Sequence, residues 1–223
     1  MIARIGYLIL IDTGALMLVK DEHMQTVYID MDDVLCQTAQ HFLAILERDF
    51  GKKFAFEQLT DFDVGQACEL TAEEREVLYR IVHDGEELLS IPPIPGAVDV
   101  LQQWSAAGYE IAIVTGRPPG TYEPSVQWLK KQRVPYDSIL IVNKYGRFAP
   151  DGSRCISLEA LINHSFSWAV EDSPEMAMYL ASQMKIPVAL LDRPWNRKDT
   201  NHELVSRHYD WIEISRALPP NNR

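Results

Sequence analysis

The stretch Thr26–Leu35, TVYIDMDDVL, decides the fold of this chain. Its short apolar run, Val27 to Ile29, ends in three acids at Asp30, Asp32 and Asp33. An apolar run of that length is typical of a strand buried on both faces of a parallel sheet. Ligands of such sheets bind just beyond the carboxyl ends of the strands. Two acids two positions apart at a strand end therefore predict a site that holds one hard divalent cation through oxygens. The alternative is an acidic turn that binds nothing.

The composition limits the possible functions. The chain has 223 residues, 47% of them hydrophobic, which suits one globular domain with a modest insertion. Its net charge is −11, because 32 acidic residues outnumber 21 Lys and Arg residues. Such a surface repels polyanions, so a nucleic-acid polymer is not expected as a partner, whereas a small phosphate ester held by a metal is. The three cysteines have no metal or redox spacing, which is the pattern expected of a cytoplasmic protein.

Residues 1–23 require separate treatment. The run from Ile2 to Val19 is apolar but is interrupted by Asp12, so it is too short and too broken to span a membrane. No small-x-small cleavage pattern follows it. We interpret residues 1–23 as an N-terminal extension, and whether it belongs to the native protein stays open. The compact domain is expected to begin at Met24.

The rest of the chain has two kinds of pattern. Residues 36–92 show helical periods without strand alternation: a helix over 37–50, an aromatic connector, and a second helix opened by a Thr71/Glu74 capping box. The proline-rich run at 91–96 then predicts a boundary. Beyond it, strands at 110–114, 138–142, 168–170 and 187–191 alternate with helices at 98–107, 122–133, 158–163 and 175–184. This order predicts an α/β fold, a doubly wound parallel sheet formed by 24–35 and 93–223, with 36–92 as an inserted helical cap.

Polar residues recur where these strands end. Asp30 and Asp32 follow the first strand, Thr115 the second, Lys144 the third, and Glu171 with Asp172 the fourth. Because the carboxyl ends of parallel strands meet at one edge, we expect these side chains to converge. Acids, a hydroxyl and an amine together predict a phosphoryl-transfer site, which needs a nucleophile, a cation, donors to the phosphoryl oxygens and an acid for the leaving group.

These motifs resemble the haloacid dehalogenase-like (HAD) superfamily of phosphohydrolases over residues 26 to about 197. The first motif, a strand followed by DxD, matches Asp30-Met31-Asp32; the second matches IAIVTGRP, and the fourth matches WAVEDSP. The segment IPPIPGAVDVLQQWSAAGYE and the closing IPVALLDRPWNR are similar to the bacterial 5′-nucleotidase and 5′(3′)-deoxyribonucleotidase-like branch. The resemblance implies a Rossmann-like HAD core, a small cap and hydrolysis of nucleoside or deoxynucleoside monophosphates, with a homodimer possible.

The resemblance also implies roles for individual residues. Asp30 would be the nucleophile that forms an aspartyl-phosphate, and Asp32 would protonate the leaving group and then activate water. Mg²⁺ would be held by the Asp30 carboxylate, the Asp32 carbonyl and Asp172, with Glu171 in a supporting role.

The other implied roles concern the phosphoryl oxygens and the substrate. Thr115 and the Gly116 amide would bind the oxygens, and Arg117 would contact the substrate or instead pair with an acid. The lysine of the third motif is missing from its usual helix, so Lys144 is the expected replacement, with Arg147 as the other candidate. Asp33 also departs from the family pattern, which usually has glycine there. The expected effect of that acid is either to tune metal affinity or to be solvent-exposed.

Other functions fit parts of the pattern. A phosphatase for another small phosphorylated metabolite has the same core motifs. Phosphonate C–P hydrolysis needs a cap lysine that forms a Schiff base, and Lys52 and Lys53 are the only cap lysines. A non-catalytic binding relic of the fold would bind metal without turnover, although the intact DxD motif disfavours it.

Overall fold

A seven-stranded parallel sheet forms the centre of the computed structural model, which describes residues 8–10, 16–18, 25–148, 155–198 and 201–218. The strand order is β6-β5-β4-β3-β7-β8-β9, and every pairing is parallel. The strands are β3 (Thr26–Ile29), β4 (Glu110–Thr115), β5 (Ser138–Asn143), β6 (Cys155–Ser157), β7 (Trp168–Glu171), β8 (Val188–Leu191) and β9 (Val205–His208). The predicted doubly wound α/β fold is confirmed, with the DxD strand β3 at its middle.

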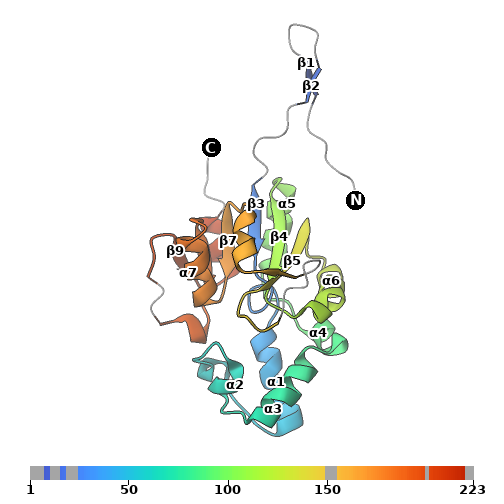
Figure 1. Cartoon of the computed structure of the whole chain (residues 1–223), viewed down its shortest axis with the longest axis vertical. Helices are drawn as coiled ribbons and strands as arrows, with labels where there is room; N and C mark the ends of the chain where they lie inside the picture. The colour runs from blue at the N-terminus through green and yellow to red at the C-terminus, as the bar shows by residue number, and fades with distance from the viewer. Residues whose placement is uncertain (1–7, 11–15, 19–24, 149–154, 199–200, 219–223) are drawn as a thin grey trace.

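Helices cover both faces of this sheet (Figure 1). One face packs against α5 (Ala97–Ala106), α6 (Tyr122–Lys131) and α8 (Trp211–Ala217), and the other against α7 (Pro174–Ser182) and the 3₁₀ helix η3 (Glu159–Asn163). Successive side chains of a strand point to opposite faces. Val27 and Ile29 accordingly enter the first apolar core, whereas Tyr28 enters the second.

A helical insert lies between β3 and β4, at one end of the sheet (Figure 1). It contains α1 (Thr38–Phe50), the 3₁₀ helix η1 (Phe56–Gln58), α2 (Val64–Ala67), α3 (Ala72–Val82) and α4 (Gly85–Ser90). The predicted capping box opens α3: the Thr71 hydroxyl accepts from the Glu74 amide, and the Glu74 carboxylate accepts from the Thr71 amide. Leu46, Leu59 and Leu78 belong to a separate apolar core within the insert.

The two ends of the insert run side by side. The Gln37 amide donates to the Pro92 carbonyl at 2.9 Å, and the Ile94 amide donates to the Leu35 carbonyl at 2.7 Å. The segments that lead into and out of the insert are therefore hydrogen-bonded to each other, close to the ends of the cap predicted at 36–92. The division into core and cap remains a prediction about domains.

Several elements differ from the sequence-based expectation. The edge strands β6 and β9 and helix α8 were not predicted, because β6 has three residues and β9 alternates around Ser206 and Arg207 rather than forming an apolar run. The segment 158–163, predicted as a helix, is the short 3₁₀ helix η3. Two further 3₁₀ helices, η2 (Pro119–Thr121) and η4 (Pro194–Asn196), follow β4 and β8.

Of residues 1–23, only 8–10 and 16–18 are described. They form β1 (Leu8–Leu10) and β2 (Leu16–Leu18), an antiparallel pair, and the prediction of an extension at 1–23 otherwise lies outside the described residues. None of the helices in the described ranges is both long and apolar enough to cross a membrane.

Candidate active site

The carboxyl ends of β3, β4, β5 and β7 bring the predicted site residues together. Asp30 directly follows β3, and its amide donates to the Val170 carbonyl of the neighbouring β7 at 3.0 Å, so the backbone beneath the carboxylate is fixed by the sheet. Asp30, Lys144, Glu171 and Asp172 are each no more than 5% exposed. The structure therefore places two strand-end acids, a lysine and a third acid in one buried cluster, as the strand-end pattern predicts.

Three carboxylates of this cluster form a candidate metal centre. One oxygen from each of Asp30, Glu171 and Asp172 lies within 4.8 Å of the other two. Burial, followed by the negative charges of Glu171 and Asp30, raises the pKa of Asp172 well above its ordinary value. Burial likewise raises the pKa of Asp30, although Lys144 opposes this shift. Hard carboxylate oxygens whose repulsion one lysine compensates only in part are a donor set that fits Mg²⁺.

Glu171 has little capacity left for a metal. Its Oε1 accepts from the Tyr28 hydroxyl at 2.8 Å and from the Lys144 ammonium at 2.7 Å, and its Oε2 accepts from the amides of Asp172 and Ser173, each at 3.0 Å. A carboxylate offers about four lone-pair positions, and four donors occupy them here. The remaining ligand candidates are Asp30, Asp172 and the Asp32 carbonyl.

Lys144 lies between two of these acids. Its ammonium donates to Asp30 Oδ1 at 2.5 Å and to Glu171 Oε1 at 2.7 Å, and its side chain is 1% exposed. Burial alone would lower the pKa of Lys144, but the charges of Asp30 and Glu171 outweigh it and raise the pKa, so the side chain is a cation. Of the two candidates for the third motif, Lys144 is the one that contacts Asp30. Arg147 instead lies over the Tyr145 ring, with its guanidinium carbon 5.0 Å from the ring centroid.

The Asp32 carboxylate forms an ion pair with an arginine. Arg117 Nε lies 3.1 and 3.0 Å from the two Asp32 oxygens, Arg117 Nη2 lies 2.7 Å from Oδ1, and the Thr38 hydroxyl donates to Oδ1 at 2.5 Å. Arg117 Nη1 donates to the Ser125 hydroxyl of α6 at 3.1 Å. Burial raises the pKa of Asp32, but the charge and hydrogen bonds of Arg117 exceed that effect and lower it overall. Of the two roles expected for Arg117, the structure shows the ion pair.

Asp33 is neither a solvent-exposed acid nor a member of the metal cluster. It is 9% exposed, adopts a left-handed backbone with φ of 55°, and both its carboxylate oxygens accept from the Ala39 amide in the first turn of α1, at 3.1 Å. Burial raises its pKa to about 7. The acid that replaces the family's usual glycine therefore caps the helix that leads into the insert.

The second motif contributes a hydroxyl and a close approach of the backbone. Thr115 is 1% exposed, and its Oγ1 accepts from the Arg117 amide at 3.2 Å, so the hydroxyl proton remains available to donate. A Cβ on Gly116 would lie 3.3 Å from both Lys144 Cδ and Tyr145 Cε2. A larger residue at Gly116 would therefore crowd Lys144.

Two residues that follow β8 donate hydrogen bonds to Asp172. Trp195 Nε1 donates to Asp172 Oδ2 at 2.9 Å, and the Asn196 amide group donates to the Asp172 carbonyl at 2.8 Å. Trp195 also contacts the insert, with its ring centroid 5.7 Å from that of Phe56. Arg197, by contrast, pairs with Asp192 and Glu57 at the surface.

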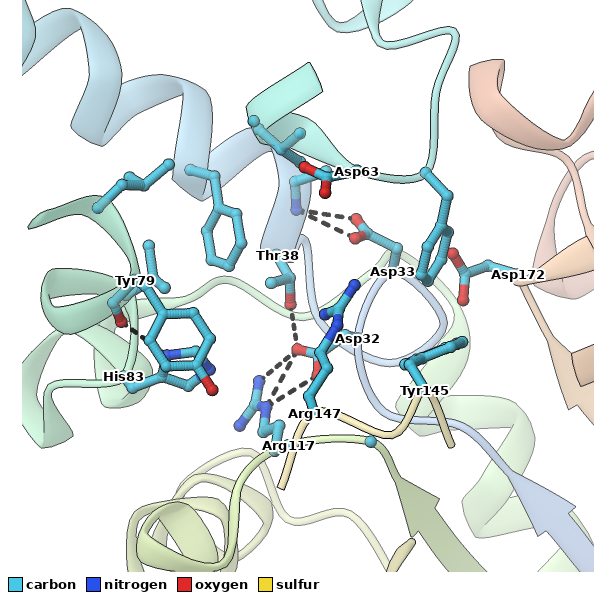
Figure 2. A pocket seen from close by; sticks show the side chains of 18 of the residues that line it. Asp32, Asp33, Thr38, Asp63, Tyr79, His83, Arg117, Tyr145, Arg147 and Asp172 are labelled. Atoms are coloured by element: carbon cyan, nitrogen blue, oxygen red, sulfur yellow. Dashed lines mark hydrogen bonds and ion pairs between the residues drawn. The ribbon is translucent and has the colours of Figure 1, made fainter. Parts of the chain in front are cut away.

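Asp30, Lys144 and Asp172 lie at the base of a cavity of about 570 Å³ between the sheet and the insert (Figure 2). Asp32, Asp33 and Asp172 line its core side, Tyr79 and His83 line the insert side, and Arg147 extends into it from the loop after β5. Apolar walls come from Phe42, Phe62, Val64, Leu78, Val82 and Leu88. Lys52 and Lys53 are absent from the lining and form ion pairs with Glu74 and Glu47. The cavity therefore combines a charged base with apolar walls.

Sequence reasoning missed the buried contact that Tyr28 makes with Glu171. The residue is fully buried, two positions before Asp30, and therefore lies on the same face of the strand as that acid. The signal in the sequence was a tyrosine, whose ring carries a polar hydroxyl, between the aliphatic residues Val27 and Ile29 and two positions before the DxD motif.

Comparisons with known proteins identify a family for this chain. The family model for 5′ nucleotidase, deoxy (pyrimidine), cytosolic type C protein matches residues 24–151. The candidate nucleotidase BH1399 of Halalkalibacterium halodurans is 26% identical over 187 residues, which are 83% of this chain and 88% of that protein. The candidate nucleotidase YqfW of Bacillus subtilis is 24% identical over 202 residues, covering 86% and 93% of the two chains.

Solved structures support the fold. A crystal structure of a predicted phosphatase from Clostridium acetobutylicum aligns with a TM-score of 0.60 and 14% identity, over 86% of this chain and 97% of that one. The HAD-hydrolase YfnB of Bacillus subtilis, solved bound to magnesium, aligns with a TM-score of 0.55 and 12% identity, over 87% and 98%. At such identities the likeness concerns the fold alone.

Proposed function

The chain belongs to the 5′ nucleotidase, deoxy (pyrimidine), cytosolic type C family and is a HAD-type phosphohydrolase, and we propose that it hydrolyses nucleoside or deoxynucleoside monophosphates with Mg²⁺ through an aspartyl-phosphate on Asp30. One observation carries the proposal: Asp30, Asp172 and Lys144 converge at the base of a cavity that has apolar walls. The cavity is within the usual size range of small-molecule sites.

The first half of the reaction transfers the phosphoryl group to the protein. A carboxylate oxygen of Asp30 attacks phosphorus, the bond from phosphorus to the ester oxygen breaks, and Asp32 gives its proton to the departing alcohol. In this proposal Lys144, Thr115 and the Gly116 amide bind the phosphoryl oxygens as charge moves onto them.

The second half releases phosphate. Asp32, now a carboxylate, takes a proton from water, the resulting hydroxide attacks phosphorus, and Asp30 leaves with its carboxylate restored. The Arg117 pair favours the ionised form of Asp32, which is the form this step needs. For the first half Asp32 must gain a proton, and the negative charge of an arriving phosphate favours that protonation.

Asp30, Asp172 and the Asp32 carbonyl would hold the metal, and Trp195 would orient Asp172. When bound, Mg²⁺ neutralises charge between Asp30 and the phosphate dianion, which would otherwise repel each other.

Substrate preference decides the nucleotide assignment. We expect phosphate release from nucleoside monophosphates, in a panel that includes sugar phosphates and an aryl phosphate, and its loss with EDTA and in the Asp30→Asn variant. Release from the aryl ester alone would retain the chemistry and refute the nucleotide assignment. In the part of the chain that the structure describes, no contact favours C–P hydrolysis, because Lys52 and Lys53 are paired outside the cavity.

A further inference from the structure

We propose that Tyr28 is a positioning residue, which holds the Lys144 ammonium on the nucleophile Asp30 through the shared carboxylate oxygen of Glu171. The proposal rests on the phosphatase function proposed above and adds to it a residue of the sheet interior that does not touch substrate.

The contacts of Tyr28 are directed at one pair of charged groups. Its hydroxyl donates to Glu171 Oε1 at 2.8 Å, and the Lys144 ammonium donates to the same oxygen at 2.7 Å. The ammonium also lies 5.2 Å from the centroid of the Tyr28 ring, within the range of a cation–π contact. One side chain therefore contacts both the lysine and the acid that anchors it.

The backbone around Tyr28 is rigid. Tyr28 pairs with Ala112 of β4 on one side and with Ala169 of β7 on the other, and its ring packs edge-on against Phe166 at a centroid distance of 5.5 Å. The residue is fully buried, so bulk solvent does not reach its hydroxyl. Its position is consequently set by the strands paired with it on both sides at the centre of the sheet.

The need for such a support follows from the freedom of Lys144. The lysine follows β5, at the start of a turn, and its long side chain must reach across the site to Asp30. Glu171 Oε2 is fixed by two backbone amides, but only side chains bind Oε1. Without the Tyr28 hydroxyl, that oxygen retains only the ammonium, and the two groups are free to shift together away from Asp30. Such a displacement of the Lys144 ammonium reduces kcat more than it weakens substrate binding, because the ammonium acts on charge that develops during phosphoryl transfer.

The test is the Tyr28→Phe variant, which keeps the ring and removes only the hydroxyl. We expect kcat to fall about tenfold while KM changes less than about twofold. The matched control is Tyr179→Phe, which removes a tyrosine hydroxyl that donates to the Leu158 carbonyl instead of to Glu171, and it should retain the wild-type kcat.

A double-mutant cycle separates positioning from a general structural effect. If Tyr28 acts through the lysine, Tyr28→Phe has no further effect on kcat in a Lys144→Met background. An equal loss in both backgrounds, or an equal loss in Tyr179→Phe, would overturn the proposal.

A second measurement does not depend on turnover. The buried Lys144 ammonium is observed by ¹H–¹⁵N NMR of lysine-labelled protein and assigned from the Lys144→Met spectrum. We expect its signal to shift or broaden in Tyr28→Phe and to stay in place in Tyr179→Phe. If the wild-type protein hydrolyses nothing in the panel, the proposed function fails, and an unmoved ammonium signal separately overturns the contact proposed for Tyr28.

Discussion

Replacing Lys144 by methionine tests how the buried charges of the site are balanced. Methionine retains much of the apolar stem of lysine and removes the ammonium that lies 2.5 Å from Asp30 and 2.7 Å from Glu171. Those two carboxylates, which are 7% and 0% exposed at the side chain, then remain buried without their cation.

The expected magnitude follows from that burial. Removing one partner of a buried ion pair typically costs about 3–5 kcal/mol of unfolding free energy, because an uncompensated charge remains. For a chain of this length such a loss corresponds to a fall in Tm of about 6–20 °C. Removing one donor to a developing oxyanion lowers kcat about 10²–10³-fold, so the same substitution should nearly abolish turnover.

The assay is urea unfolding followed by tryptophan fluorescence, with EDTA and again with Mg²⁺. Because the substitution removes a positive charge beside the acids, Mg²⁺ should restore more stability to the variant than it adds to the wild type. The control is Lys53→Met, which removes the same group from an exposed pair with Glu47 and should hardly alter Tm. A Lys144→Met protein with wild-type stability in EDTA, or with kcat within about twofold of wild type, would refute this account of the site.

Three further predictions concern neighbouring residues. The pKa of Asp33 is raised to about 7, so the folded protein holds this proton more tightly than the unfolded chain, and the wild type loses stability as pH rises from about 4 to about 7. Asp33→Asn removes that loss and keeps an oxygen that accepts from the Ala39 amide. In EDTA at pH 8, its free energy of unfolding should exceed that of the wild type by up to about 4 kcal/mol. If the two proteins show parallel curves of unfolding free energy against pH in urea, this prediction is wrong. Arg117→Met should move the basic limb of the kcat/KM profile to higher pH, because the first half of the reaction needs protonated Asp32 and Arg117 lowers the pKa of that group; an unmoved limb in the pH–rate profile would contradict the pairing. Trp195→Phe removes the donor to Asp172 and should weaken Mg²⁺ binding about tenfold in calorimetric titrations, whereas unchanged affinity would exclude a role for Trp195 in orienting that ligand.

The sequence by itself determined the central architecture and the location of the site. Buried strands carry continuous apolar runs, and the carboxyl ends of parallel strands must meet at one edge, so the convergence of Asp30, Thr115, Lys144 and Asp172 follows from the sequence pattern. The edge strands β6 and β9 were beyond this reasoning, because strands that are short or only half buried lack such a run.

Only the tertiary structure decided which polar groups pair. Lys144 and Arg147 are three residues apart and chemically alike as cations, yet only Lys144 reaches Asp30, because the loop after β5 turns Arg147 onto Tyr145. Arg117 and Asp32 are 85 residues apart, and Tyr28 and Glu171 are 143 apart, so both contacts depend on how the sheet orders its strands. Hydrogen bonds act over about 3 Å, whereas sequence patterns specify burial and strand ends only to within a residue or two. That difference in scale is why the sequence located the site and the packed structure assigned its contacts.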